Sequence, residues 1–133
     1  MSRSRSRRTV VHRSCARGAS SPLDQVLGAF VACNQVTSAI VAQGQGQGQG
    51  IELGQFSGRV EAELDNSVLV YGAEGNPNFS RVALTVELET LLDDAAFDVF
   101  VAEVTRRCPL TQLFVRSGVE VTTDWKNRVL ASA

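Results

Sequence analysis

Hydrophobic residues between positions 22 and 42 recur every three or four residues, which is the spacing of one face of an α-helix. Ser21 suits the N-cap, Pro22 the first helical position, and Asp24 the acidic position of a capping box. The apolar stripe consists of Leu23, Val26, Leu27, Phe30, Cys33, Val36, Thr37 and Ile40. We predict a central helix in which Cys33 is buried and too far from any helix terminus for its pKa to be lowered.

After residue 50 the period of the pattern changes to two residues, which is typical of strands with one solvent-exposed face. Such alternation covers residues 57–65 and 81–89, and the turn-forming sequence "GAEGNPN" lies between them. We predict that these two strands pair antiparallel, and that residues 68–71 extend the first strand or form a short one. A third strand is predicted before Trp125 from the alternating residues Val119, Val121 and Thr123.

A second long helix is predicted from Asp93, and its apolar stripe ends at Cys108. Pro109 suits the first turn of a new helix and disfavours helical backbone before it, so Cys108 should lie at a helix break. There the N-terminal N–H groups of the new helix, together with Arg106 and Arg107, favour the thiolate. The alternative is an inert cysteine that only packs in the core.

This order of helices and strands predicts an α+β fold, with two main helices packed on one antiparallel sheet. Cys33 and Cys108 each lie on the buried stripe of one main helix. Packing the two helices together should therefore bring the two sulfurs close, although the residues are far apart in the chain.

The 133 residues, of which 44% are hydrophobic, suffice for one globular domain, which we place at residues 19–125. Residues 1–18 form a basic Arg/Ser-rich leader, which we expect to be disordered and to hold Cys15 as a free thiol. The sequence at 43–50 predicts a flexible Gln/Gly connector, and residues 126–133 a C-terminal tail. The leader has the composition of a mitochondrial transit peptide, or of a basic arm that contacts an anionic partner.

Composition excludes several classes of function. The formal net charge is −1, but the arginines of the leader leave an acidic body, which is a poor nucleic-acid binder. The sequence has no run of 18 apolar residues, so we expect no membrane span. One histidine and three widely spaced cysteines lack the usual metal-ligand spacing, and we expect no cofactor. Hydrolysis by a cysteine–histidine pair would need His12, which lies in the leader.

Four segments together resemble the OsmC/Ohr superfamily, which comprises osmotically inducible protein C and the organic hydroperoxide resistance proteins. They are "SSPLDQVLGAFVACNQVT", "IELGQFSGRVEAELD", "NFSRVALTVELE" and "VTRRCPLTQLFVRSGVEV". The resemblance implies a thiol-dependent peroxidase that reduces organic hydroperoxides in oxidative stress, built as an intertwined homodimer. It also implies that Cys33 is the peroxidatic cysteine, that Cys108 is the resolving one, and that a dithiol of the lipoyl or thioredoxin type is the reductant. Cysteines used in this way indicate the reducing cytoplasm, or the mitochondrion if the leader is a transit peptide.

The chain departs from the family pattern at its N-terminus. Family members begin with further strands and a loop arginine that activates the peroxidatic thiolate, whereas this chain has only the leader, in which Arg13 and Arg17 do not match. Asp24 stands where the family has a carboxylate, but helix capping alone explains it. Local sequence favours Cys108 as the thiolate, whereas the resemblance assigns the attack to Cys33. The alternative function is a truncated, non-catalytic OsmC-like protein that binds a small apolar ligand.

Overall fold

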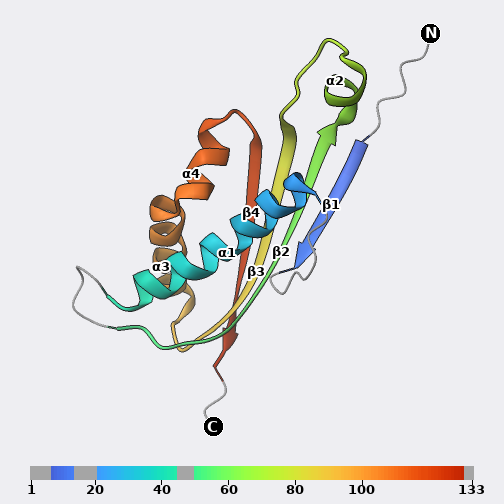
Figure 1. Ribbon diagram of the computed structural model, residues 1–133. Coiled ribbons are helices and arrows are strands. Elements are labelled where there is room, and N and C mark those ends of the chain that lie inside the picture. The colour runs from blue at the N-terminus through green and yellow to red at the C-terminus, as the bar shows by residue number, and fades with distance from the viewer. Residues whose placement is uncertain (1–6, 14–20, 45–49, 131–133) are drawn as a thin grey trace.

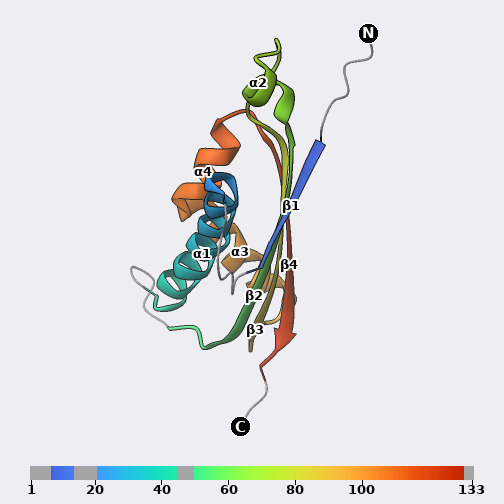
Figure 2. The same cartoon turned by 45° about the vertical axis from the view of Figure 1, so that its right-hand side comes forward.

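The computed structural model describes residues 7–13, 21–44 and 50–130, and for residues 7–13 it describes the backbone. Three helices cover one face of a four-stranded sheet, with α2 at the end of the sheet (Figures 1 and 2). The predicted α+β class is confirmed. In chain order the elements are β1 (Arg7–Arg13), α1 (Pro22–Ala42), β2 (Leu53–Asp65), α2 (Asn66–Tyr71), β3 (Phe79–Thr90), α3 (Asp94–Arg107), α4 (Pro109–Arg116) and β4 (Glu120–Val129).

The long helix α1 begins as its sequence predicts. The Ser21 side chain accepts a hydrogen bond from the Asp24 N–H at 3.1 Å, which satisfies one of the unpaired donors of the first turn. The side chains of Leu27, Phe30 and Val31 are fully buried in the core. Judged by length and composition alone, α1 is the one helix of the described residues that could cross a membrane, a test that core helices of globular proteins also pass.

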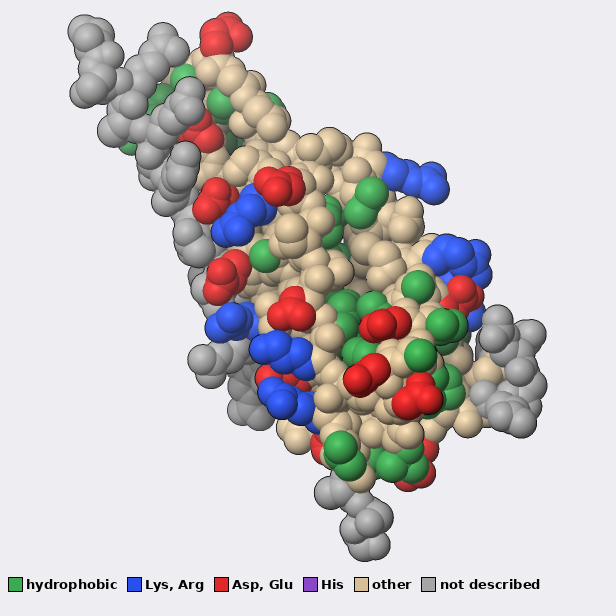
Figure 3. Space-filling view, turned by 180° about the vertical axis from the view of Figure 1, so that it is seen from behind, with side chains coloured by type: hydrophobic (Ala, Val, Ile, Leu, Met, Phe, Trp, Pro, Cys, Tyr) green, Lys and Arg blue, Asp and Glu red, His purple; other side chains and the backbone are tan. Residues whose placement is uncertain are grey.

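The predicted antiparallel pairing of the two alternating strands is confirmed. β2 and β3 pair with Val60 opposite Leu84 and Ala62 opposite Val82, and all four of these side chains are buried beneath the helices. The other face of the sheet is polar, and from behind acidic and basic side chains are interspersed over it (Figure 3). The single wet face of these strands follows directly from their two-residue period.

The prediction of a wholly antiparallel sheet is wrong for the last strand. β4 pairs with β3 in parallel, with Val82 opposite Val121 and Val86 opposite Trp125. A parallel neighbour needs a crossover connection, and α3 and α4 supply it between the two strands. β4 also continues to Val129, so residues 126–129 of the predicted tail belong to the sheet.

One strand lies within the predicted leader. β1 pairs antiparallel with β2, with Thr9 opposite Glu63 and Val11 opposite Glu61, so the prediction of disorder is wrong for residues 7–13. The resemblance led us to expect that the N-terminal strands of the family are missing. This expectation is also wrong in part, because one such strand, β1, is present. The β-branched run Thr9–Val11 favours a strand, a signal that the surrounding arginines obscured. The other leader residues, including Cys15 and Arg17, lie outside the described residues.

Residues 68–71 are helical, and the prediction that they extend or form a strand is wrong. Asp65 caps α2 because its side chain accepts from the Ser67 N–H at 2.9 Å. Gly72 ends the helix in the left-handed conformation, with φ of 67°, which glycine adopts without a steric penalty. The central part of the predicted connector, residues 45–49, lies outside the described residues.

Candidate functional site

The two candidate cysteines meet where α1 crosses the junction of α3 and α4. The Sγ atoms of Cys33 and Cys108 lie 3.4 Å apart, although 75 positions separate the residues in the chain. Both are free thiols. The prediction that helix packing brings the two sulfurs together is confirmed, and the pair is placed for thiol–disulfide chemistry.

Cys108 occupies the predicted helix break. It is the C-cap of α3 and the N-cap of α4, with extended backbone (φ −73°, ψ 113°). Its N–H donates to the Val104 carbonyl at 2.9 Å, and its own carbonyl accepts from the Gln112 N–H at 3.1 Å. The backbone of Cys108 is therefore fixed by one hydrogen bond to each helix.

The two sulfur-bearing side chains differ in their access to solvent. Cys108 is 0% exposed, whereas Cys33 is partly exposed, so the prediction that Cys33 is buried is wrong in this respect. The helix α1 is rotated from the predicted stripe, because Val26, Val36 and Ile40 are exposed while Asn34 and Ser38 are buried. Cys33 is thus the more accessible of the two cysteine residues.

Four buried polar side chains lie on the two helices that carry the sulfur pair or follow it, and we call them the polar layer: Asn34, Thr37 and Ser38 on α1, with Thr111 on α4. The Asn34 Nδ2 group donates to the Phe30 carbonyl at 2.9 Å and to Thr111 Oγ1 at 3.4 Å. Ser38 Oγ donates to the Asn34 carbonyl at 2.7 Å. These contacts satisfy groups that would otherwise be costly to bury.

Sequence reasoning missed most of the polar layer. The apolar stripe predicted for α1 includes Thr37, and the hydrophobic pattern gives no role to Asn34, Ser38 or Thr111. The available signal was the spacing of Asn34 and Ser38, which follow Phe30 and Val31 at helical intervals on the buried side of α1. Polar side chains at buried positions of a helix are nearly always hydrogen-bonded, so they indicate that hydrogen-bond partners lie nearby.

Hydrogen bonding lowers the pKa of the Cys108 thiol. Burial acts in the opposite direction and raises it, but the Thr111 hydroxyl and backbone N–H, the Cys33 thiol and the Thr37 hydroxyl together outweigh burial. Thr111 lies in the first turn of α4, where free N–H groups and the helix dipole favour negative charge. The direction agrees with the sequence expectation that the helix break favours a thiolate at Cys108.

The pKa of the Cys33 thiol is raised. Burial is the largest cause, and the hydrogen bond and charge of Cys108 add to it, against the lowering effects of the Leu110 N–H and the Thr37 hydroxyl. Leu110 belongs to the first turn of α4, so a helix terminus does reach Cys33, and the contrary prediction is wrong. None of these groups is a side-chain cation.

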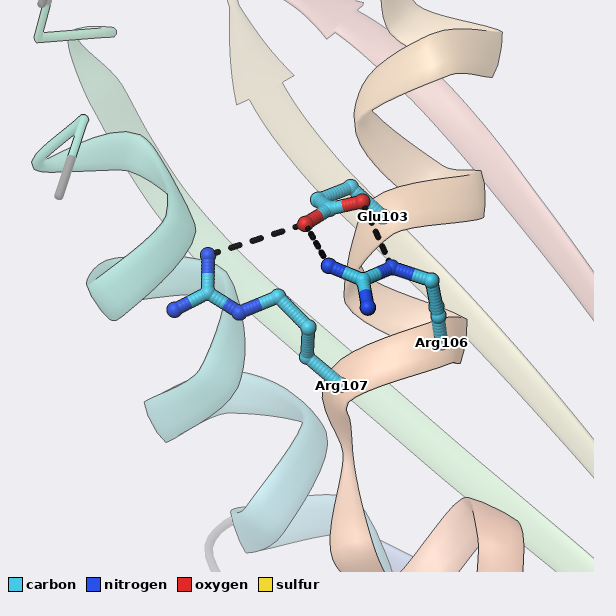
Figure 4. A network of polar contacts seen from close by, with 3 residues as sticks. All are labelled: Glu103, Arg106 and Arg107. Atoms are coloured by element: carbon cyan, nitrogen blue, oxygen red, sulfur yellow. Dashed lines mark hydrogen bonds and ion pairs between the residues drawn. The ribbon is translucent and has the colours of Figure 1, made fainter. Parts of the chain in front are cut away.

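The two arginines before Cys108 are engaged elsewhere. Arg106 makes two hydrogen bonds with Glu103, from Nε at 3.0 Å and from Nη2 at 2.6 Å. Arg107 lies 3.8 Å from the same carboxylate, and both side chains extend toward Glu103 (Figure 4). The expected help of these arginines to the Cys108 thiolate is therefore reduced by their shared acidic partner.

A groove of about 720 Å³ lies between the C-terminal end of α1 and α3. Its apolar lining includes Val41, Ile51, Leu92, Val99 and Phe100, and the Glu103, Arg106 and Arg107 side chains also line it. This volume falls within the range of pockets that hold small organic ligands. Neither cysteine lines the groove, and Arg107, the residue before Cys108, is the lining residue nearest to the thiol pair in the sequence.

Asp24 has a structural role at the start of α1, where its N–H meets the Ser21 cap. It precedes Cys33 by nine residues, or about 13 Å along a helix axis. His12 and Arg13 lie in β1, and for both residues the structure describes the backbone.

Comparisons with known proteins agree on the fold. The family model described as OsmC-like protein matches residues 16–124. An OsmC-like protein from Mycoplasma pneumoniae is 17% identical with a TM-score of 0.67, over 80% of this chain and 71% of that one. An organic hydroperoxide resistance protein from Legionella pneumophila, also described as a predicted redox protein, is 20% identical with a TM-score of 0.57, over 83% and 72%. The organic hydroperoxide resistance protein OhrB of Bacillus subtilis is 21% identical with a TM-score of 0.53, over 80% and 70%.

A search of curated proteins finds no match. The family match nevertheless covers most of the chain, from before α1 to the middle of β4. It includes both cysteines and every element that positions them. The chain therefore belongs to the OsmC-like protein family.

Proposed function

We propose that this protein is a thiol-dependent peroxidase that reduces organic hydroperoxides, with Cys33 as the peroxidatic and Cys108 as the resolving cysteine. The observation that carries the proposal is the 3.4 Å separation of the two sulfurs at a site that solvent reaches on the Cys33 side. Two proteins of similar fold, from Legionella pneumophila and Bacillus subtilis, are described as organic hydroperoxide resistance proteins.

The reaction needs two sulfurs with different tasks. The Cys33 thiolate attacks the distal oxygen of the hydroperoxide, the O–O bond breaks, and Cys33 becomes a sulfenic acid. Cys108 then attacks the oxidised sulfur and forms the disulfide, and an external dithiol of the lipoyl or thioredoxin type restores both thiols. The partial exposure of Cys33 and the full burial of Cys108 support this division of roles.

The apolar groove between α1 and α3, which neither cysteine lines, is the described pocket in which we place the organic part of the substrate. Its volume suits a molecule with a hydrocarbon body, and apolar side chains form most of its lining. Burying such a body contributes roughly 25 cal/mol for each Å² removed from water, which hydrogen peroxide cannot gain.

A homodimer is part of the proposal. Exposed residues of α1 include Val26, Val36 and Ile40, and Val36 is 58% exposed. The sequence of α1 has no charged residue after Asp24, so this face lacks the charged side chains of a typical surface helix. A second copy of the chain would remove this surface from water.

A second candidate function is favoured by the raised pKa of Cys33. A thiol that stays protonated at neutral pH is a weak nucleophile, and the groove would still bind a small apolar molecule. In that case the protein would be a non-catalytic OsmC-like binding protein.

Mass spectrometry after one equivalent of cumene hydroperoxide separates these functions. The wild type should form a Cys33–Cys108 disulfide, Cys33→Ser should not react, and Cys108→Ser should stop at oxidised Cys33. Cys15→Ser is the matched control, because it removes a thiol without touching the pair. Turnover with a dithiol reductant should follow the same pattern, and oxidation no faster than that of a free thiol would favour the binding protein.

A further inference from the structure

Three contacts join α1 to the segment that begins at Cys108 and continues as α4. They are a sulfur pair, a hydrogen bond and a ring pair, formed in this order by Cys33 with Cys108, Asn34 with Thr111, and Phe30 with Phe114. On the α4 side, successive contacts are three residues apart, which is about one turn of a helix. The hydrogen bond therefore lies between the sulfur pair and the ring pair, one turn from Cys108.

The side-chain amide of Asn34 is anchored on its own helix. Its Nδ2 group lies 2.9 Å from the Phe30 carbonyl, which can only accept a hydrogen bond, so the NH2 end of the amide must face this carbonyl. The second N–H of the same group donates to Thr111 Oγ1, in a longer contact of 3.4 Å. Both Asn34 and Thr111 are buried. The amide thus presents one donor at a fixed place on α1, and α4 must bring its acceptor to that place.

The backbone of Cys108 is tied to the turn of α4 that holds Thr111. Cys108 is the N-cap of this helix, and its carbonyl accepts from the N–H of Gln112, the residue after Thr111, at 3.1 Å. The Gln112 side chain also donates to the Thr105 carbonyl of α3 at 3.0 Å, which ties α4 to α3 across the helix break. The position of Thr111 against α1 therefore determines the position of Cys108.

We propose that Asn34 and Thr111 are positioning residues, and that their hydrogen bond holds the two reduced sulfurs at a distance from which a disulfide forms. Cys33 directly precedes Asn34 in α1, so a shift of α4 along α1 would break this hydrogen bond and separate the sulfurs at the same time. The ring pair resists such a shift less, because apolar contacts are not directional whereas hydrogen bonds are. The proposal concerns the thiol pair itself and does not depend on the reduction of peroxides.

Thiol–disulfide exchange with glutathione measures this positioning. The Cys33 thiolate attacks glutathione disulfide, whose S–S bond breaks, so that one glutathione leaves and the other stays on Cys33 as a mixed disulfide. Cys108 then attacks Cys33 Sγ, the protein disulfide forms, and the second glutathione leaves. Glutathione disulfide gains the two electrons that the pair loses, and the two protons of the cysteines end on the two glutathione thiols. The equilibrium constant is an effective concentration, which rises with the alignment of the two sulfurs.

The test uses the Cys15→Ser protein, which keeps the pair and removes the third thiol. Equilibration in glutathione buffers, thiol trapping and mass spectrometry give the disulfide equilibrium constant. Thr111→Val replaces the hydroxyl by a methyl group and should lower this constant about threefold to tenfold, as expected from the net contribution of one hydrogen bond. Thr111→Ser keeps the hydroxyl and should stay near the wild-type value. Asn34→Leu should lower the constant as Thr111→Val does.

The double variant Asn34→Leu, Thr111→Val separates positioning from stability. When both partners of a buried hydrogen bond become apolar, neither is left unsatisfied, so this protein should fold even if one of the single variants does not. Its disulfide equilibrium constant should nevertheless stay low, because an apolar contact does not restore the directional link between α1 and α4. The constant is measured in the folded protein, so it reports the alignment of the sulfurs and not the free energy of unfolding.

Ser38→Ala is the matched control. Ser38 is also a buried hydroxyl of the polar layer, but it donates to the Asn34 carbonyl within α1, at 2.7 Å, so its loss should leave the equilibrium constant unchanged. A wild-type constant in Thr111→Val or in the double variant would overturn the positioning role. An equal loss in Thr111→Ser would assign the effect to packing, and an equal loss in Ser38→Ala would assign it to general loosening; either result overturns the proposal, as does a wild type that forms no disulfide.

Discussion

Asn34 on α1 donates a hydrogen bond to Thr111 on α4 across 77 positions of the sequence, directly beside the sulfur pair. The two helices thus contact one another through a polar link and a thiol pair at the same level. In a core that is otherwise apolar, such a link fixes how the helices are aligned, because a shifted alignment would leave buried polar groups without partners.

Oxidation of the pair should stabilise the fold. A Cys33–Cys108 disulfide closes a loop of about 75 residues, and the chain-entropy estimate for such a loop is about 4 kcal/mol in the free energy of unfolding. Urea denaturation of the oxidised and reduced Cys15→Ser protein measures the difference. Cys108→Ser treated with the same oxidant should show no such increase, and a disulfide that lowers stability would contradict the observed placement of the helices.

Alkylation of Cys33 should depend on pH with an apparent pKa above that of an ordinary thiol. Burial and the neighbouring Cys108 both raise the pKa of Cys33, so its thiolate fraction increases only as the pH rises through this higher value. In Cys108→Ser the contribution of Cys108 is gone, and the apparent pKa should fall. Iodoacetamide labelling across a pH series, with each site quantified by mass spectrometry, measures both values; a higher apparent pKa in the variant would refute the coupling.

Phe30→Ala should strongly destabilise the protein. The Phe30 ring is fully buried and meets the Phe114 ring edge to face, with centroids 4.9 Å apart. Removing a buried ring typically lowers the free energy of unfolding by about 3 to 5 kcal/mol. Val129→Ala is the control, because Val129 is 87% exposed, and it should change little in thermal or urea unfolding.

A charge on the outer face of α1 should disrupt the proposed homodimer. Val36→Glu places a carboxylate at the centre of the apolar face, where dimer formation would bury it without a partner. Sedimentation velocity should show a dimer for the wild type and a monomer for this variant. Val129→Glu, at a position 87% exposed on β4, is the matched control and should remain dimeric. A wild type that sediments as a monomer at micromolar concentration would rule the dimer out.

The sequence predicted the elements whose signals are local. Helix α1, the pair β2 and β3, and the helix break at Cys108 follow from periodicity, capping residues and Pro109. The approach of the two sulfurs also followed, because each cysteine was predicted to lie on the packed side of its helix, although Cys33 is only partly buried. Membership of the OsmC-like family was predicted from the same segments.

The remaining features depend on contacts between distant segments. The direction of β4 is decided by the crossover through α3 and α4, and a run of alternating residues carries no direction. β1 is stabilised by its pairing with β2, because its short β-branched run is a weak strand signal among arginines. Asn34 and Thr111 are hydrogen-bonded to each other across two helices, and the helix pattern around a buried asparagine does not identify such a distant partner.

The difference in burial between the two sulfurs determines how an oxidised protein would be recycled. Cys33 is the more exposed of the two residues, so we expect the thiolate of a reductant from solvent to attack the Cys33 sulfur of the disulfide and to expel Cys108 as the leaving group. A thiol of lower pKa leaves faster, and Cys108 is the member of the pair whose pKa is lowered. Since the Cys108 backbone is fixed to both α3 and α4, the expelled sulfur stays in place, and a mixed disulfide on Cys33 is the species that a dithiol trap should capture.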